Sequence, residues 1–407
     1  MPAATRRLQH NGVSQVGSSG EEATRQLSVC NACRYCEGYC AVFPALTDVV
    51  ALDDLSVAYL GHLCHDCGAC VQACMYSEPH PFRIDIRRLL QEERVRTYER
   101  YTTPEFARRA FERPVRAFVL TVALVVALAT VGVAETSRWH QLTTRLQGAG
   151  AFYKVVPYGV MLGVALGISF LAAWLVAAKA RRFWADIRTA VREGIGRPSG
   201  ARAIARVAWE ALVLRWQTGG GDGCYALDND RPSGMRRCLH VSLVFGFGLA
   251  FAATIAAAIE QDLAGIEPPY PLLSVPVVLG LIGGILMMAG AAGLLILRVA
   301  ADPAVSVAPM RKLDYTFIFS LILVALTGIL LLALRNEPGM GVLLLVHLVS
   351  VGVFFLLIPY SKMLHSVFRL LALCRFGLNT PSPDQENRRS TSRGSDAPGI
   401  AELGDAK

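Results

Sequence analysis

Six apolar runs constrain the fold of this chain more than any other feature. Each is long enough to cross the hydrocarbon core of a bilayer, which takes about 20 residues of α-helix, and charges are nearly absent inside them. They cover roughly residues 115–135, 155–178, 238–259, 273–297, 314–334 and 341–361. The hydrophobic content of 53% agrees with a membrane protein. We therefore predict a mainly α-helical protein in which residues 114–376 form a six-helix transmembrane bundle.

Lys and Arg are concentrated in alternate loops between these runs. The loop between the second and third runs carries Lys179 and eleven Arg, whereas "IEQDLAGIEPPYP", before the fourth run, carries none. Because cytoplasmic loops of membrane proteins are enriched in Lys and Arg, we place both termini on the cytoplasmic side of a bacterial-type inner membrane. This distribution explains the net charge of +8 without a nucleic-acid partner.

The two ends of the chain and one long loop are polar. Residues 1–27 and 377–407 lack long apolar segments, so we expect disordered tails there. Within the cytoplasmic loop 179–237, helical periodicity over residues 180–194 and 201–216 predicts two amphipathic helices. These helices would either lie on the membrane surface or form a soluble hairpin.

Eight of the eleven cysteines lie in two runs of identical spacing within residues 28–113, the cytoplasmic segment before the first span. The runs are Cys30-x2-Cys33-x2-Cys36-x3-Cys40 and Cys64-x2-Cys67-x2-Cys70-x3-Cys74. In bacterial ferredoxins with this spacing, three close cysteines bind one [4Fe–4S] cluster and the fourth binds the other cluster. The spacing thus predicts two clusters. The first has the ligands Cys30, Cys33, Cys36 and Cys74, and the second has Cys64, Cys67, Cys70 and Cys40.

Two other uses of clustered thiols agree less well with this pattern. Zinc ribbons use pairs of cysteines rather than runs of four. Disulfide frameworks are typical of oxidising compartments, whereas this segment is expected in the cytoplasm. Cys224, Cys238 and Cys374 have no cluster spacing, and we expect them to be structural.

The residues around the runs differ from those of the small all-β ferredoxins. Ala41 and Met75 follow the fourth cysteine of each run, where proline is usual. The segment "TDVVALDDLSVAYLGHL" between the runs has a helical pattern. We therefore expect a helical two-cluster ferredoxin-type domain, similar to that of the iron–sulfur subunits of succinate dehydrogenase-like enzymes.

Three histidines are candidate haem ligands, because polar groups inside a bilayer are costly and usually functional. His240 lies in the third run, His347 lies within the sixth, and His365 lies at its end. The 18 residues from His347 to His365 equal five helical turns, so one continuous helix would present both on one face. Because His240 and His365 match in depth near the cytoplasmic surface, we predict that they bind one haem b. A pairing of His240 with His347 is the alternative.

These features together resemble the tricarballylate (citrate) utilization protein B family, over about residues 28–376. The most specific pieces are "CNACRYCEGYCAVFPAL", "LCHDCGACVQACMYSEPHPFRIDI" and "GGGDGCYALDNDRPSGMRRCLH". The membrane part is also similar to the cytochrome b subunit of respiratory nitrate reductase. That subunit has two histidines at the same 18-residue step in its last helix, two more in a partner helix, and two haems. The second histidine of the partner helix is absent here, which favours one haem.

The resemblance implies a membrane electron-transfer protein, an oxidoreductase subunit. Members of the family reoxidise a separate flavin-containing tricarballylate dehydrogenase and pass the electrons to the quinone pool, and the eight cysteines match the family's cluster ligands one for one. An alternative is a quinol-oxidising subunit that donates electrons to a cytoplasmic reductase. A transporter with a redox sensor domain would need ionisable residues at mid-membrane, and the spans contain almost none.

Overall fold

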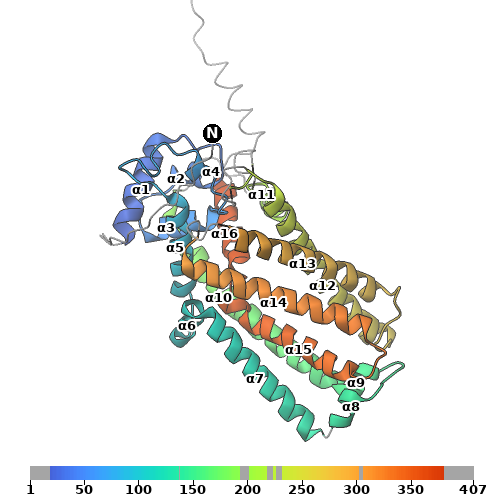
Figure 1. The fold of residues 1–407 in the computed structure, drawn as a ribbon. Coiled ribbons are helices and arrows are strands. Elements are labelled where there is room, and N and C mark those ends of the chain that lie inside the picture. The colour runs from blue at the N-terminus through green and yellow to red at the C-terminus, as the bar shows by residue number, and fades with distance from the viewer. Residues whose placement is uncertain are drawn as a thin grey trace, which may run out of the picture.

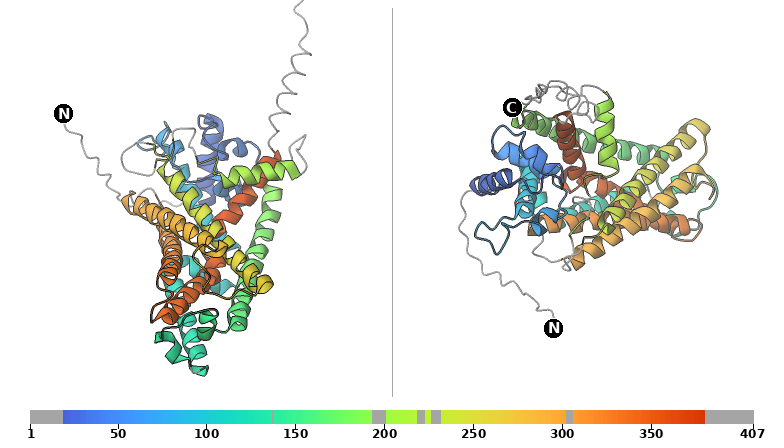
Figure 2. Two further views of the ribbon diagram at one scale, coloured as in Figure 1. Left: turned by 90° about the vertical axis from the view of Figure 1, so that its right-hand side faces the viewer. Right: turned by 90° about the horizontal axis from the view of Figure 1, so that it is seen from above.

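The structure is a computed structural model, and it describes residues 19–136, 138–192, 201–217, 223–225, 232–301 and 306–379. A small helical N-terminal part sits on one end of a bundle of long, inclined helices (Figure 1), and the same division is visible from two other directions (Figure 2). Within the described residues there is no β-strand, only two isolated bridges. The predicted mainly α fold is confirmed.

Five helices build the N-terminal part. They are α1 (Ser19–Cys33), α2 (Val42–Leu46), α3 (Asp54–Leu63), α4 (Ala69–Gln72) and α5 (Ile86–Arg100). Aspartate side chains cap the two central helices, as is usual at helix N-termini. Asp53 accepts a hydrogen bond from Ser56 N (2.9 Å) at the start of α3, and Asp85 accepts one from Arg88 N (3.0 Å) at the start of α5.

Helix α1 begins earlier than predicted. Residues 19–27 were expected in the disordered tail, but they are helical, and Leu27 is fully buried. Ala23, one turn before Leu27, is buried as well, so this segment is held by its contribution to the core. The remaining parts of the predicted tails, residues 1–18 and 380–407, lie outside the described residues.

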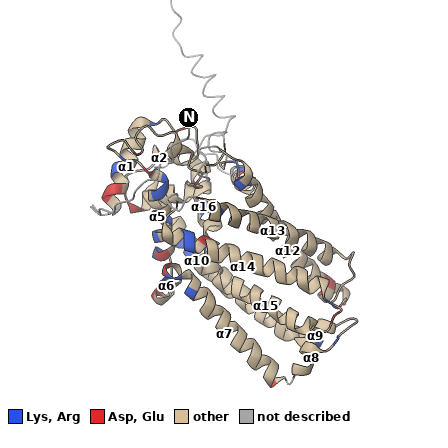
Figure 3. Cartoon of the chain, viewed as in Figure 1, with Lys and Arg blue, Asp and Glu red and all other residues tan. Residues whose placement is uncertain are grey.

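Among the described residues, six helices are long and apolar enough to cross a membrane, as the six apolar runs predict. They are α7 (Pro114–Glu135), α10 (Tyr158–Ala190), α12 (Met235–Ala264), α13 (Val275–Ala300), α14 (Ala308–Ala333) and α15 (Met340–Leu357), the last continued by η4 (Ile358–Tyr360). The short segments η1 (Glu105–Arg108) and α6 (Arg109–Glu112) precede α7, and α8 (Trp139–Thr143) and α9 (Ala151–Val155) connect α7 with α10. Charged residues are concentrated in the N-terminal part and near helix ends (Figure 3).

Helices α12 and α13 pack closely, because small residues lie at their interface. A Cβ atom at Gly283 would lie 2.7 Å from Ala250 N, and one at Gly290 would lie 2.6 Å from Leu239 O. Neither distance leaves room for a side chain, so the two backbones can approach only at glycine. This contact fixes the first turns of α12, which carry His240.

Helix α10 extends beyond the predicted second span. It continues without interruption to Ala190, so residues 180–190 do not belong to the separate helix predicted over 180–194. The ring of Phe183 stacks on that of Phe368, with ring centroids 4.6 Å apart. The apolar side of this extension therefore packs against protein, which explains its amphipathic pattern without a membrane surface.

The second predicted helix of this loop is present as α11 (Ala201–Leu212), which packs against α16 (Leu364–Asn379). Val207 of α11 is buried in the same core as the extension of α10. Residues 193–200, 218–222 and 226–231 of the loop lie outside the described residues.

The sixth span ends at a break in the helix. Helix α15 passes into η4, which contains Pro359, and Ser361 is extended before α16 begins at Leu364. Proline disrupts a helix because it has no N–H to donate and its ring clashes with the preceding turn. His347 and His365 therefore lie on two different helices. The expectation that one continuous helix carries both was wrong.

One hydrophobic core joins the N-terminal part to the bundle. It contains side chains of α1, α3 and α5 together with side chains of α10, α14 and α16. Its largest fully buried aromatic side chains are Tyr59, Tyr98, Phe111, Phe183 and Phe368. The N-terminal part is thus held to the bundle by packed side chains as well as by the chain connection.

Candidate functional site

Four of the predicted cluster ligands line a single cavity. Cys64 follows α3, Cys67 lies in the next loop, Cys70 lies in α4, and Cys40 reaches the cavity from the first cysteine run. These are the four cysteines predicted to bind the second cluster. The structure thus gives Cys40 the position that the crossed assignment requires.

The other crossed cysteine, Cys74, lies beside the first run. The pKa of the Cys30 thiol is raised to about 12, first by burial and then by the neighbouring thiols of Cys74, Cys36 and Cys33. Cys74 also acts on Cys36, whose pKa is raised to about 11, again mainly by burial. The structure therefore groups Cys74 with the three cysteines predicted to share the first cluster.

These thiols need a cation between them to become thiolates, because burial and mutual repulsion both oppose deprotonation. Among the described residues, no three Cys, His, Asp or Glu side chains are close enough to share a single metal ion. A tetrahedral zinc site needs sulfur atoms about 3.8 Å apart. The cysteines of a four-iron cluster each bind a different iron and so lie further apart. The two clusters and their individual ligand assignments stay predictions.

A network of buried charges shapes the loop of the second cluster. Asp66 forms an ion pair with Arg87 (2.6 Å) and accepts a hydrogen bond from Gln91 (2.5 Å). Burial alone would raise the pKa of Asp66, but Arg87 and Arg236 outweigh it and hold this pKa well below its usual range. At Gly68 (φ +80°) a Cβ would lie 2.8 Å from Arg87 Nη1, so this turn of the loop requires glycine.

The predicted haem ligands His240 of α12 and His365 of α16 face each other. Their ring centroids are 6.1 Å apart, and their planes are nearly perpendicular, at 85°. A metal–imidazole bond of about 2.0 Å places the centroids of two imidazoles on opposite sides of one metal roughly 6.3 Å apart. The observed spacing therefore suits a single iron held by both rings.

The hydrogen bonds of this pair also suit iron ligation. His365 Nδ1 donates to the carbonyl of Lys362 (2.5 Å), which leaves Nε2 as the free nitrogen. Burial, followed by the positive charge of Lys362, lowers the pKa of His365 to about 3, so the ring is neutral at physiological pH. His240 Nδ1 is buried and has no hydrogen-bond partner in the part of the chain that the structure describes.

Two family models together match most of the chain. The description "Citrate utilization protein B Fer4-like domain" matches residues 23–100, and "Citrate utilization protein B" matches residues 109–386. Citrate utilization protein B of Escherichia coli is 38% identical over 367 residues, which cover 88% of this chain and 92% of the relative. The chain belongs to the citrate utilization protein B family. No solved structure matches it.

In this citrate utilization protein B family member, the third candidate histidine has a different environment. His347 of α15 shares a hydrogen bond with Thr327 Oγ1 of α14 (3.0 Å), and its ring packs on Gly328. The structure thus brings together His240 and His365, the pair favoured from the sequence, and places His347 against α14.

Sequence reasoning missed the arginines that lie near the second cysteine run and the histidine pair in this family member. Arg94 and Arg369 donate to carbonyls at the end of α3, and Arg236 donates to the carbonyl of Asp66 (2.5 Å). Only "GMRRCLH" hints at one of them, because Arg236 precedes His240 by about one helical turn. The others come from segments distant in sequence.

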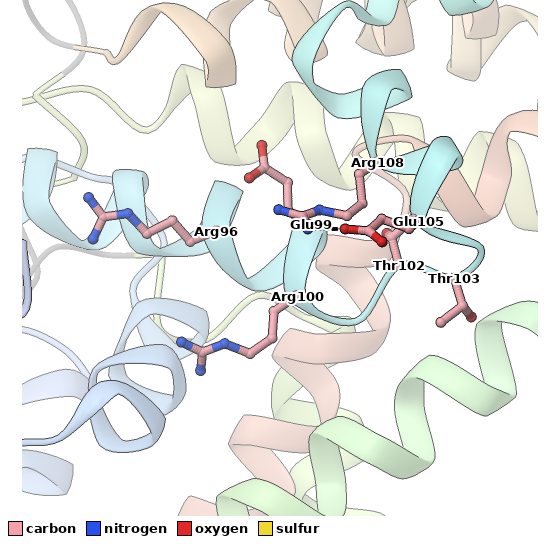
Figure 4. A pocket seen from close by; sticks show the side chains of 7 residues that line it. All are labelled: Arg96, Glu99, Arg100, Thr102, Thr103, Glu105 and Arg108. Carbon is pink, nitrogen blue, oxygen red and sulfur yellow. Dashed lines mark hydrogen bonds and ion pairs between the residues drawn. The ribbon is translucent and has the colours of Figure 1, made fainter.

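A separate polar depression lies where α5 leads into η1 (Figure 4). It is lined by Arg96, Glu99, Arg100, Thr102, Thr103, Glu105 and Arg108. Arg108 pairs with Glu105 at 3.4 Å, and both are substantially exposed. This lining contains no thiol or imidazole, so we assign it no part in binding a cluster or a haem.

Proposed function

We propose that the chain is a membrane electron-transfer subunit. In this proposal it reoxidises a flavin-containing tricarballylate dehydrogenase, and the electrons pass through two [4Fe–4S] clusters and one haem b to the quinone pool. The family and its ferredoxin-like domain fit an electron-transfer role in citrate utilization. The flavoprotein, the haem and the quinone are the further parts of the proposal.

The observation that carries the proposal is the position of the histidine pair beside the second cysteine site. Helix α12 carries Arg236, whose guanidinium donates to the carbonyl of Asp66 in the cysteine loop (2.5 Å), and His240 one turn further on. Tyr225 N, in the segment before α12, donates to the carbonyl of Cys67 (2.7 Å). Helix α12 is therefore hydrogen-bonded to the cysteine loop of the proposed second cluster and carries His240, a proposed haem ligand.

Clusters and haem each accept one electron at a time, so together they would divide the two-electron oxidation of a flavin into single steps. The residues of the chain supply position and access. Cys33 of the first site is exposed, whereas Cys40 and Cys67 of the second are buried. We infer that electrons from a soluble partner enter at the first site, and that the second site lies inside.

The charge distribution supports a cytoplasmic position for the N-terminal part. Lys and Arg lie around this part and the adjoining ends of the long helices (Figure 3), as the positive-inside rule expects of the cytoplasmic side. A cytoplasmic flavoprotein would then have direct access to the exposed Cys33.

The test is the optical and electron paramagnetic resonance spectrum of the purified full-length protein, oxidised and reduced with dithionite. We expect two [4Fe–4S] signals and the bands of one b-type haem. Replacing His240 with Ala should abolish the haem bands and keep both cluster signals. His347→Ala is the matched control and should keep the haem.

Two results would count against the proposal. Absence of haem bands from the wild-type protein would refute the proposal of a haem. Haem bands that persist in His240→Ala but vanish in His347→Ala would refute His240 as a ligand and indicate His347 instead. Loss of the cluster signals in both variants would show general unfolding. The wild-type protein and both variants would then be refolded with iron and sulfide, and their haem uptake would be compared.

A further inference from the structure

Two arginines, the buried Arg94 and the half-buried Arg369, converge on the carboxyl end of α3, immediately before the candidate cluster ligand Cys64. Arg94 of α5 donates to the carbonyls of Gly61 (2.7 Å) and Cys64 (2.6 Å). Arg369 of α16 donates to the carbonyl of Leu63 (3.1 Å). The last carbonyls of a helix have no partner within it and attract positive charge, so both guanidinium groups suit this position.

The two arginines differ in the helix that carries them. Arg369 lies four residues after His365 on α16, so both side chains project from the same face. Arg94 belongs to the N-terminal part and has no such link to a candidate haem ligand. Of the two arginines at the end of α3, only Arg369 therefore joins the backbone next to a cysteine of the second run to the helix of a candidate haem histidine, as Arg236 does from the helix of His240.

The guanidinium of Arg369 also places a charge close to both centres. Burial, followed by the charge of Arg94, lowers the pKa of Arg369 to about 10, while the thiols of Cys64 and Cys40 act in the opposite direction. Arg369 thus remains positive at neutral pH.

Buried aromatic rings lie beside Arg369 and the end of α3. His62 of α3 lies two residues before Cys64, and its ring contacts the ring of Phe368, the neighbour of Arg369, with centroids 5.1 Å apart. Phe183 of α10 contacts both rings. In a dry environment a fixed charge acts more strongly on its neighbours than it would in water.

We propose that Arg369 is a positioning residue for electron transfer, which joins the loop of the second cluster to the haem helix and holds one positive charge between the two centres. This inference rests on the proposed function, because it assumes both cofactors. A positive charge stabilises the reduced form of a neighbouring centre, so Arg369 should raise the midpoint potentials of the second cluster and of the haem together.

The test is a redox titration of the full-length protein, followed optically for the haem and by electron paramagnetic resonance for the clusters. Arg369→Gln should shift both midpoint potentials to more negative values and slow the reduction of the haem by reduced clusters. Arg94→Gln removes an equal charge near Cys64 and should shift the cluster alone. Arg369→Lys should restore the potentials more than the rate, because it keeps the charge but loses the guanidinium geometry.

The outcomes separate this inference from the proposed function. The inference alone would be overturned if Arg369→Gln kept the wild-type midpoint potentials of clusters and haem and the wild-type rate of haem reduction. It would also be overturned if Arg369→Gln and Arg94→Gln shifted the midpoint potential of the haem equally. A wild-type protein without haem would overturn both. If Arg369→Gln lost its cofactors, the comparison of Arg369→Lys with wild type would decide: an unchanged haem reduction rate would contradict the inference.

Discussion

At the scale of single residues, the crossing of Cys40 and Cys74 between the two runs is the most specific feature of the cysteine sites. The two runs alone would allow each set of four to form its own centre. The structure instead places Cys40 in the cavity of the second run and Cys74 beside the first. If the clusters bind as predicted, each site depends on both runs.

The crossing leads to a direct prediction for Cys74→Ser. This variant should lose the first cluster and keep the second, and its non-haem iron content should fall from about eight to about four per chain. Cys40→Ser should show the opposite loss. Iron analysis with electron paramagnetic resonance checks both variants.

Cys224→Ser is the control for this experiment, because Cys224 is buried and packs near Cys67 without belonging to either run. It should retain both clusters. If Cys74→Ser instead lost the cluster that depends on Cys64 and kept the one that depends on Cys30, each run would form its own site and the crossing would be refuted.

Glu93 of α5 gives a prediction for pH. Its side chain is buried, Oε2 lies 3.7 Å from Arg96, and Oε1 has no hydrogen-bond partner among the described residues. The pKa is raised from 4.5 to about 7, mainly by burial. Because the folded protein disfavours the charged form, this group supports stability below pH 4.5 and loses that contribution as the pH rises through about 7. Glu93→Gln should therefore stabilise the protein at pH 8 by up to about 3 kcal/mol.

The measurement is thermal unfolding in detergent at pH 5 and pH 8. Glu93→Gln should raise the midpoint at pH 8 and change it much less at pH 5. Glu92→Gln, at an exposed neighbour that pairs with Arg88, is the control and should show little difference. An equal effect of Glu93→Gln at both pH values would contradict the assignment.

At the scale of helices, the close contact of α12 with α13 positions His240. A Cβ at Gly283 would approach the backbone at Ala250 N and Gly246 O, at 2.7 and 2.8 Å. Gly283→Ala should therefore cost about 1–3 kcal/mol and reduce the haem content. Gly280→Ala is the matched control, because the nearest atom to its new methyl group is Ala253 Cβ at 3.6 Å. Haem per protein, from the reduced spectrum, should fall only in the Gly283 variant, and equal haem in both would contradict this account.

The sequence predicted the helices better than their ends. Apolar length alone was enough for the six spans, because each helix must satisfy its backbone within the bilayer. The prediction that His347 and His365 lie on one helix was wrong, because the count of helical turns between them ignored Pro359, which ends the sixth span. The extension of α10 was missed for a related reason: an amphipathic pattern shows that one side is covered, but it cannot show that protein rather than lipid covers it.

The candidate site was predictable where the spacing is local. Sequence positions and depth were enough to predict that Cys40 lies with the second run, that Cys74 lies with the first, and that His240 lies beside His365. The arginines could not be predicted, because Arg94 and Arg369 reach the end of α3 from helices that are distant in sequence. Their role depends on tertiary contacts that leave no local pattern.

At the scale of the whole molecule, the N-terminal part and the bundle share one core. Phe183 of α10, Phe368 of α16 and Tyr98 of α5 are buried together. Side chains also connect the parts, since Lys179 of α10 donates to Thr102 Oγ1 (3.1 Å) and to the carbonyl of Pro359 (2.5 Å). Such packing holds the two candidate centres at a fixed separation, which a flexible linker would not do.

The central claim is that electrons reach quinone through both parts of the chain, and one measurement tests it most directly. The full-length protein in liposomes that contain quinone is mixed with reduced flavin-containing tricarballylate dehydrogenase, and haem and quinone are followed by stopped-flow absorbance. We predict transient reduction of the haem followed by formation of quinol, and loss of quinol formation in His365→Ala with both clusters intact. Quinol formation at the wild-type rate in a His365→Ala protein that lacks haem would contradict the account.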